Sequence, residues 1–113
     1  MKIEKFHIYL ADLNPRFGTE PGKIRPVVVI QTNLLNDVHA STIICPMTSH
    51  VTKGSKILRV HLTKKQSGID CESDILVDQI RAIDNRRLIK HIGRLTFLDQ
   101  RRLLENLQIV ILE

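Results

Sequence analysis

The residue best suited to phosphate chemistry is an arginine at the end of a turn-rich stretch. Arg25 follows residues 14–24, which include two prolines and two glycines, and precedes the β-branched run 27–30. Such a run is typical of a strand buried on both faces, which would aim the guanidinium rigidly. The planar guanidinium carries five donors and matches phosphate oxygens. We therefore interpret Arg25 as a functional side chain rather than as a surface ion-pair partner.

The cysteines and histidines do not form a metal-binding pattern. Cys45 and Cys71 are far apart, without C-x-x-C spacing, and the five histidines include no H-E-x-x-H pair. Separate thiols of this kind usually behave as small buried hydrophobic side chains. We therefore expect both cysteines to be buried, and we expect no metal and no other cofactor.

The charge distribution indicates an anionic partner. Lys and Arg number 17 against 12 Asp and Glu, which gives a net charge of +5. The excess is concentrated in residues 53–65 and 81–102. Such clusters are typical of a protein that binds a phosphate backbone or meets an acidic partner, although a merely solvated cationic surface is the alternative. Aromatic residues make up only 4% of the chain, so an extended base-stacking surface is not expected.

Length and composition indicate a single globular domain. The chain has 113 residues, of which 42% are hydrophobic and 26% charged, enough to build one core without disulfides or metals. We expect one domain over residues 1–113. No apolar run approaches the length of a membrane span, and the first residues lack the pattern of a signal peptide. A cytoplasmic protein that does not bind membranes is the expectation.

Most of the sequence favours short strands. Alternating or continuous apolar runs predict them at residues 7–13, 27–30, 42–46, 57–62, 75–77 and 79–83. Pro26 fits the first position of the second strand, where a missing N–H does little harm. A short helical turn is expected around residues 85–88. Only one helix has the length of a crossover, so the pattern predicts a mainly-β barrel or rolled sheet rather than a parallel α/β fold.

The last segment changes to helical periodicity. Thr96 and Asp99 have capping-box spacing. The apolar residues expected on one helical face are Phe97, Leu104, Leu107 and Ile111, beside Leu103 and Val110. Residues 107–112 are more apolar than one face requires. Either the helix gives way to a final strand, or this surface meets another subunit.

Three ordered segments resemble one known family. They are Tyr9-Leu-Ala-Asp-Leu-Asn-Pro with Gly18-Thr-Glu-Pro-Gly-Lys-Ile-Arg-Pro-Val-Val-Val-Ile-Gln31, then Pro46-Met-Thr-Ser49, and then Ser73-Asp-Ile-Leu-Val-Asp-Gln-Ile-Arg-Ala-Ile-Asp84 followed by Arg87-Leu88. The set resembles the MazF/PemK family of toxin endoribonucleases and spans about residues 7 to 88. This resemblance implies a small SH3-like barrel with a C-terminal helix, a homodimer, and metal-independent cleavage of single-stranded RNA. It also implies a cognate antitoxin with an acidic tail.

The resemblance also implies roles for individual residues. Arg25 and Thr48 match the catalytic pair, although a threonine at a turn usually makes only a local hydrogen bond. An arginine is a poor base at neutral pH, so we assign Arg25 to transition-state stabilisation and keep it as a candidate for the general acid. Two candidates for the general base stay open, the loop residue Glu20 and the histidine His50.

Four further residues are expected to bind RNA: Phe17, Glu20, Ser49 and Gln79. Ser49 and Gln79 match family positions that donate hydrogen bonds to bases or backbone. Phe17 either stacks on one base or anchors its loop on the core. Arg81 and Arg86 are either structural or backbone-binding.

The sequence departs from the family pattern at two places. Phe6-His7 replaces the Gly-Asp that usually precedes the first strand, and Ala82 stands where threonine is common. The alternatives are an inactive SH3-like module that binds RNA or protein, and a toxin of the same fold that poisons DNA gyrase. The absence of tryptophan from the chain argues against the gyrase toxin, whose relatives act through a Trp-containing tail.

Overall fold

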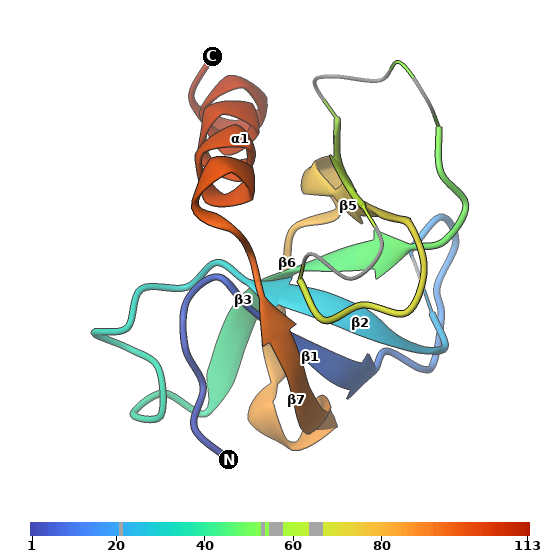
Figure 1. The fold of residues 1–113 in the computed structure, drawn as a ribbon. Coiled ribbons are helices and arrows are strands. Elements are labelled where there is room, and N and C mark those ends of the chain that lie inside the picture. The colour runs from blue at the N-terminus through green and yellow to red at the C-terminus, as the bar shows by residue number, and fades with distance from the viewer. Residues whose placement is uncertain (21, 53, 55–57, 64–66) are drawn as a thin grey trace.

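Seven strands form one open antiparallel sheet in the computed structural model, which describes residues 1–20, 22–52, 54, 58–63 and 67–113. The order is β4-β5-β3-β2-β1-β7, with β6 paired to the first half of β3 (Figure 1). The strands are β1 (His7–Asp12), β2 (Ile24–Val29), β3 (Ser41–Thr48), β4 (Arg59–Leu62), β5 (Ser73–Leu76), β6 (Arg81–Asp84) and β7 (Leu88–Arg94). The prediction of a mainly-β, barrel-like fold with a C-terminal helix is confirmed, although this path of strands does not close into a ring.

The sheet is buried on both faces around its central strands. In β1 and β2 alternate side chains enter two different cores: Ile8 and Val28 belong to one, Tyr9 and Val27 to the other. This pattern follows from the period of two along a strand. The prediction that the run 27–30 is buried on both faces is therefore confirmed for Val27, Val28 and Val29, which are fully buried.

β2 begins earlier than the sequence predicts. It starts at Ile24, so that Arg25 lies within the strand and pairs with Ala11 of β1. Pro26 is the third residue of the strand rather than the first. It lies one residue before the pairing with β3 begins at Val27, which is why the strand tolerates the missing N–H.

β7 is the strand that the sequence analysis missed. It is an edge strand that pairs only with β1 among the described strands, with two register irregularities. Lys90, His91 and Arg94 are exposed, so no clean alternation marks the segment. Charged side chains on an edge strand are common because they prevent pairing with other chains. The turn before it is confirmed as the 3-10 helix η2 (Asn85–Arg87), and a second, η1 (Val77–Gln79), follows β5.

The C-terminal helix α1 (Phe97–Leu107) stands against one side of the sheet, directly after β7 (Figure 1). The hydroxyl half of the predicted cap is present: Thr96 Oγ1 accepts a hydrogen bond from the Asp99 backbone N–H at 3.2 Å. The Asp99 carboxylate accepts from the Thr96 hydroxyl at 3.0 Å rather than from the Thr96 backbone N–H, so the cap is not the reciprocal capping box. The helix continues as the π-helix η3 (Gln108–Leu112), so the alternative of a final strand is wrong.

The predicted buried face of the helix is also wrong in part. Leu103 of α1 is completely buried in the first core. Leu107 and Val110 are partly buried against the same core. These residues follow helical spacing and face β4 and η1. Phe97, Leu104 and Ile111, which were expected on the buried face, remain 73%, 45% and 54% exposed. The helix therefore carries a second apolar surface that its own chain does not cover.

The two cysteines differ in environment. Cys45 is buried in the first core, where burial raises the pKa of its thiol to about 12. Cys71 is an exposed free thiol, so the expectation that both cysteines are buried is wrong for Cys71. It lies in the loop before β5, in which Asp70, Cys71 and Glu72 are exposed whereas Ile69 is buried in the core. Among the described residues, no helix has the length and apolar character needed to span a membrane.

Candidate active site

The ends of β2 and β3 open into a cavity of about 300 Å³ that Arg25 and Thr48 both line. Ser49 and His50, which follow Thr48, also line it. The described lining residues with polar groups are Lys23, Arg25, Thr48, Ser49, His50, Cys71 and Ser73. No carboxylate side chain is among these lining residues, so the cavity offers hydroxyl and cationic groups to an anion.

Arg25 is held in a fixed direction by two backbone carbonyls. Its Nε donates to the Gly22 carbonyl at 2.8 Å and its Nη1 donates to the Met47 carbonyl at 3.1 Å. The side chain is half-buried, and this burial, with the nearby Arg16, lowers the pKa of Arg25. Two anchored nitrogens leave donors of the guanidinium available to a ligand. The interpretation that a rigid element aims Arg25 is confirmed.

Gly22 is needed where the loop returns to β2. A Cβ at this position would lie 2.6 Å from the Arg16 Cβ, which is closer than real side chains approach. The base of the loop is closed by Asn14, whose Oδ1 accepts from the Lys23 backbone N–H at 2.9 Å, and by Arg87, which donates to the Asp12 carbonyl at 2.9 Å. These contacts fix the point from which Arg25 departs.

Thr48 makes a local hydrogen bond as well as lining the cavity. Its Oγ1 accepts from the His50 backbone N–H at 3.1 Å. That is the local role that the sequence by itself favours for a threonine at a turn. Because the hydroxyl accepts in this bond, its own proton is free to donate to a ligand. The two roles are compatible.

A buried carboxylate supports the turn that follows Thr48. Asp74 pairs with Thr48 across β3 and β5 and is 1% exposed. Its Oδ2 accepts from the Thr52 backbone N–H at 2.9 Å and from Arg59 Nη1 at 3.1 Å. Its Oδ1 lies 3.0 Å from His61 Nδ1.

Arg59 connects this carboxylate to the turn itself, since its Nη1 also donates to the His50 carbonyl at 2.7 Å. Burial by itself would raise the pKa of Asp74, but the hydrogen bonds from Thr52, His61 and Arg59 outweigh it and lower that pKa. Asp74 is therefore a charged anchor for residues 48–52.

Sequence reasoning missed this group of Asp74, Arg59 and His61. A signal was present: Arg59 and His61 are two residues apart on one strand and so point to the same side. Asp74 follows Ser73 inside a segment used for the family resemblance, but nothing in the sequence indicated that its side chain would be buried.

The predicted RNA-binding residues are divided by the structure. Ser49 lies at the cavity, whereas Phe17, Glu20 and Gln79 are not among its described lining residues. Phe17 is 69% exposed at the loop, so the alternative that it anchors the loop on the core is wrong. The Glu20 backbone N–H donates to the Phe17 carbonyl at 3.0 Å, which makes a tight turn at the loop tip. Gln79 is half-buried at the end of η1.

The other arginines and the departures from the family pattern lie outside the cavity lining. Arg86 makes a two-pronged ion pair with Asp84, with both N–O distances at 3.0 Å. Phe6 adopts a positive φ of 68° before β1. His7 Nδ1 lies 2.9 Å from His91 Nε2 on β7. The described residues contain no group of three or more His, Cys, Asp or Glu side chains arranged to hold a metal ion.

A small open β-sheet with a C-terminal helix, and a cavity lined by cationic and hydroxyl groups, define a mainly-β protein with a candidate site for an anion. Comparison with known proteins narrows this class. The family model described as PemK-like, MazF-like toxin of type II toxin-antitoxin system matches residues 4–111. The chain belongs to this toxin family.

Individual relatives agree with the family match. An endoribonuclease MazF from Staphylococcus epidermidis is 37% identical over 103 residues, covering 91% of this chain and 83% of that relative. The solved structure of MazF from Deinococcus radiodurans superposes with a TM-score of 0.85 at 23% identity, covering 100% of this chain and 99% of that one. A MazE-MazF structure from the same organism superposes with a TM-score of 0.76 at 20% identity and covers the same shares.

Proposed function

We propose that this protein is an mRNA interferase, a toxin that cleaves single-stranded RNA without a metal ion. The single observation that carries this proposal is that the Arg25 guanidinium and the Thr48 hydroxyl line one cavity whose described lining includes no carboxylate. Such a cavity suits a phosphodiester. The family match and the relative named endoribonuclease MazF support the reaction.

RNA supplies its own nucleophile for this reaction. The 2′-oxygen attacks the adjacent phosphorus as the 2′-hydroxyl proton passes to a base, and the bond from phosphorus to the 5′-oxygen breaks. The leaving oxygen takes up a proton, so the products are a 2′,3′-cyclic phosphate and a 5′-hydroxyl. Catalysis then requires in-line positioning and stabilisation of the charge on the phosphorane.

The cavity residues fit these two tasks. Arg25, fixed by the Gly22 and Met47 carbonyls, would donate to the phosphate oxygens in the transition state. Thr48 would donate its free hydroxyl proton to the same phosphate. Ser49, the third residue at this edge, would hydrogen-bond the neighbouring nucleotide.

The general base has two candidates in different places. His50 lines the cavity and is held through its backbone by Thr48 and Arg59. Glu20 lies in the loop, outside the described lining, and would need the loop to close over the substrate. The pH profiles of His50→Gln and Glu20→Gln distinguish them, because the variant that lacks the base loses the limb of the profile that reports its titration.

The remaining predicted residues would bind the RNA strand beyond the cleaved phosphate. Phe17 offers an exposed ring on which one base can stack. Gln79 would contact a base edge through its amide, which both donates and accepts. These roles leave the sequence of the cleaved RNA to the shape of the groove.

We also propose that a cognate antitoxin with an acidic segment inhibits the protein by covering the cationic cavity. The net charge of +5 and the cationic lining groups suit an acidic segment as well as RNA. The superposition on a MazE-MazF structure supports this partner. Co-expression with the cognate antitoxin is expected to give a stable complex that no longer cleaves RNA.

Residues 1–113 would act as a single toxin domain in the cytoplasm, as a homodimer. The apolar surface of α1 and η3 that the rest of the described chain does not cover is the candidate dimer interface. A groove on this surface is lined by Leu104, Leu107, Ile111 and Leu112. Apolar patches of this kind mark interaction sites. Sedimentation is expected to give a dimer for the wild type and a monomer for Leu104→Glu, with Glu105→Gln as the control.

Cleavage of a long single-stranded RNA in EDTA tests the proposed activity. Fragments that end in a 2′,3′-cyclic phosphate are expected from the wild type, and Arg25→Ala is expected to lower the rate at least ~10²-fold. Intact RNA from a folded wild-type dimer, tested on several transcripts, would show that the protein is instead a binding module. Fragments that form only when Mg²⁺ is added would overturn the metal-free mechanism.

A further inference from the structure

A second cavity adjoins the candidate active site on the same side of the sheet. It has a volume of about 450 Å³ and shares Pro26, Cys71 and Ser73 with the lining of the first cavity. The two cavities are therefore neighbours that share part of their walls. A strand whose phosphate lies at Arg25 would pass into the second cavity within a nucleotide or so.

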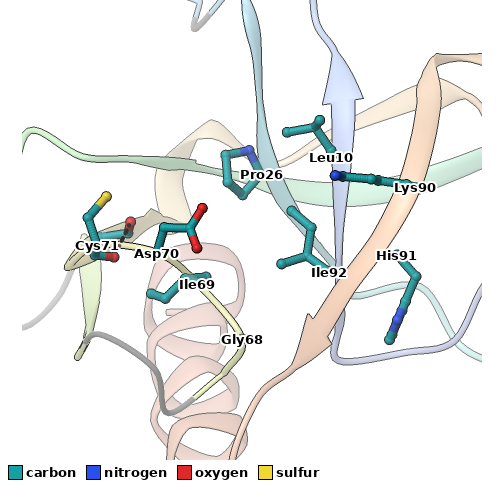
Figure 2. A pocket seen from close by; sticks show the side chains of 10 residues that line it. Leu10, Pro26, Gly68, Ile69, Asp70, Cys71, Lys90, His91 and Ile92 are labelled. Atoms are coloured by element: carbon teal, nitrogen blue, oxygen red, sulfur yellow. Dashed lines mark hydrogen bonds between the residues drawn. The ribbon is translucent and has the colours of Figure 1, made fainter.

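The second cavity lies between a loop and the sheet. Ile69, Asp70 and Cys71 come from the loop before β5, and they face Pro26 of β2 and Ile92 of β7 across the opening (Figure 2). The backbones of loop and strand meet at the lower end. A Cβ on Gly68 would lie 2.7 Å from the Ile92 carbonyl oxygen, and one on Gly93 would lie 2.0 Å from the Ser67 carbonyl oxygen.

This contact requires glycine at both positions, and Gly68 also has a φ of +81° that favours glycine. Because the loop is held against β7 at this point and enters β5 at Ser73, its wall of the cavity is set before any ligand binds. A preformed cavity loses less entropy on binding than one that must be assembled.

The chemistry of the lining suits one flat heterocycle. Leu10, Pro26, Ile69 and Ile92 supply apolar surface, while Asp70 and Lys90 supply one charge of each sign. Figure 2 shows Asp70 pointing from the loop toward Pro26, and Lys90 reaching past Leu10 from β7. An apolar cavity with a few polar groups is typical of small-ligand sites. Unstacked bases of single-stranded RNA are bound in this way, by their faces and by their edges.

We propose that this second cavity is a base-specificity subsite, which binds one unstacked nucleobase beside the cleaved phosphate and selects a base with an exocyclic amino group. This inference rests on the proposed function for its RNA ligand. The Asp70 carboxylate accepts hydrogen bonds only, so it pairs with the amino groups of adenine, cytosine or guanine. Uracil has no exocyclic amino group. The one donor on its edge, N3–H, lies between two carbonyl oxygens that the carboxylate repels.

Lys90 has a different role in this subsite. Its ammonium group carries no acceptor and contacts the phosphate or sugar of the bound nucleotide, which adds affinity without selecting a base. An acidic antitoxin segment is the competing occupant of the same cavity. Asp70 disfavours that occupant, because its carboxylate would lie against the carboxylates of the acidic segment and repel them.

The test compares substitutions that remove a charge at similar side-chain size inside the cavity with the same kind of substitution outside it. The variants are Asp70→Asn and Lys90→Gln, and the controls are Glu105→Gln and Arg101→Gln, both at exposed positions of α1. Each protein is given a randomised single-stranded RNA pool for cleavage mapping. Each is also given the same pool with 2′-deoxy nucleotides, from which bound sequences are selected.

The wild type is expected to exclude uracil at one position next to the cleaved bond. Asp70→Asn, whose amide both donates and accepts, is expected to reduce this discrimination about fivefold or more. Lys90→Gln is expected to weaken binding of all sequences alike and to reduce the salt slope by about 0.7. The two control variants are expected to match the wild type in both measurements.

Each other outcome is decisive. If the wild type cleaves RNA and Asp70→Asn keeps the same base preference, the subsite assignment is wrong although the proposed function stands. If the wild type selects RNA with the Asp70-dependent preference but does not cleave it, the subsite stands and the proposed activity falls. If Lys90→Gln weakens only the binding of a poly-glutamate peptide, the cavity is an acidic-peptide site and the inference is overturned. If the wild type neither cleaves nor binds RNA, both proposals are wrong.

Discussion

The two sides of the candidate site are built in contrasting ways. On one side, Arg25 and Thr48 lie on paired strands, and their side chains hydrogen-bond to the backbone of the same region. On the other side, Phe17 and Glu20 lie at the tip of the 14–23 loop. Phe17 is 69% exposed. Arg25 and Thr48, proposed to act on the phosphate, are fixed by these hydrogen bonds, whereas the Phe17 ring, proposed to stack on a base, faces solvent.

This difference indicates which residues contribute to the rate of cleavage and which contribute to the affinity for RNA. Fixed donors stabilise the charge of a transition state without reorganising. Such electrostatic stabilisation is usually the largest single contribution to catalysis. An exposed loop side chain loses conformational freedom when it contacts RNA, so its contribution is to binding rather than to rate. Changes to Arg25 or Thr48 should lower kcat, and changes to the Phe17 ring should raise KM.

Replacing Arg25 by lysine is the strongest way to break this comparison. Lysine keeps the charge but cannot donate to the Gly22 and Met47 carbonyls and to a phosphate in one plane. We expect kcat for RNA cleavage to fall about 10²-fold with little change in KM. Single-turnover cleavage at saturating protein measures it. If kcat stays within a few-fold of the wild type, the guanidinium geometry is not part of catalysis.

Replacing Phe17 by alanine tests the loop side. Loss of one base-stacking contact is expected to weaken RNA binding by about 1–3 kcal/mol, as a rise in KM with kcat nearly unchanged. Phe17→Tyr, which keeps an aromatic face, should restore binding, whereas Phe17→Leu should not. A fall in kcat without a change in KM would place Phe17 among the fixed residues and remove the contrast.

The sequence predicted the position of Arg25 better than that of Asp74, the buried carboxylate that supports the turn after Thr48. The fixed position of Arg25 could be predicted because its surroundings are local: a turn-rich stretch before it and a β-branched run after it. The burial of Asp74 could not, because it depends on the pairing of Thr48 with Asp74 between strands distant in sequence. The exposed face of α1 was misassigned for a similar reason. Two apolar stripes fit one helix, and only the position of β4 and η1 decides that Leu103 is the buried one.

Asp74 gives the smallest effect on cleavage and a distinct effect on stability. Asp74→Asn weakens the bonds to the Thr52 N–H and Arg59 that hold residues 48–52. We expect kcat to fall several-fold, since Thr48 becomes less well positioned. The free energy of unfolding at pH 7 should fall by about 1–3 kcal/mol, because the Thr52 N–H and Arg59 lose a buried, charged acceptor.

The pH dependence of that loss identifies the carboxylate as its cause. The pKa of Asp74 is lowered in the folded protein, so its stabilising contribution is complete above the unfolded pKa of about 3.9 and disappears as the pH falls through the lower, folded value. The difference in unfolding free energy between wild type and Asp74→Asn should therefore be present at pH 7 and shrink below about pH 4. Urea unfolding at several pH values measures it.

Asp84→Asn is the matched control for this experiment. The pKa of Asp84 is also lowered, to about 2, through its hydrogen bonds with Arg86, but this pair is exposed to solvent. Solvent and salt screen an exposed pair far more than a buried one. Raising the salt concentration should therefore diminish the effect of Asp84→Asn and leave that of Asp74→Asn nearly unchanged. Equal salt sensitivity in the two variants would mean that Asp74 does not act as a buried anchor for the turn that carries Thr48.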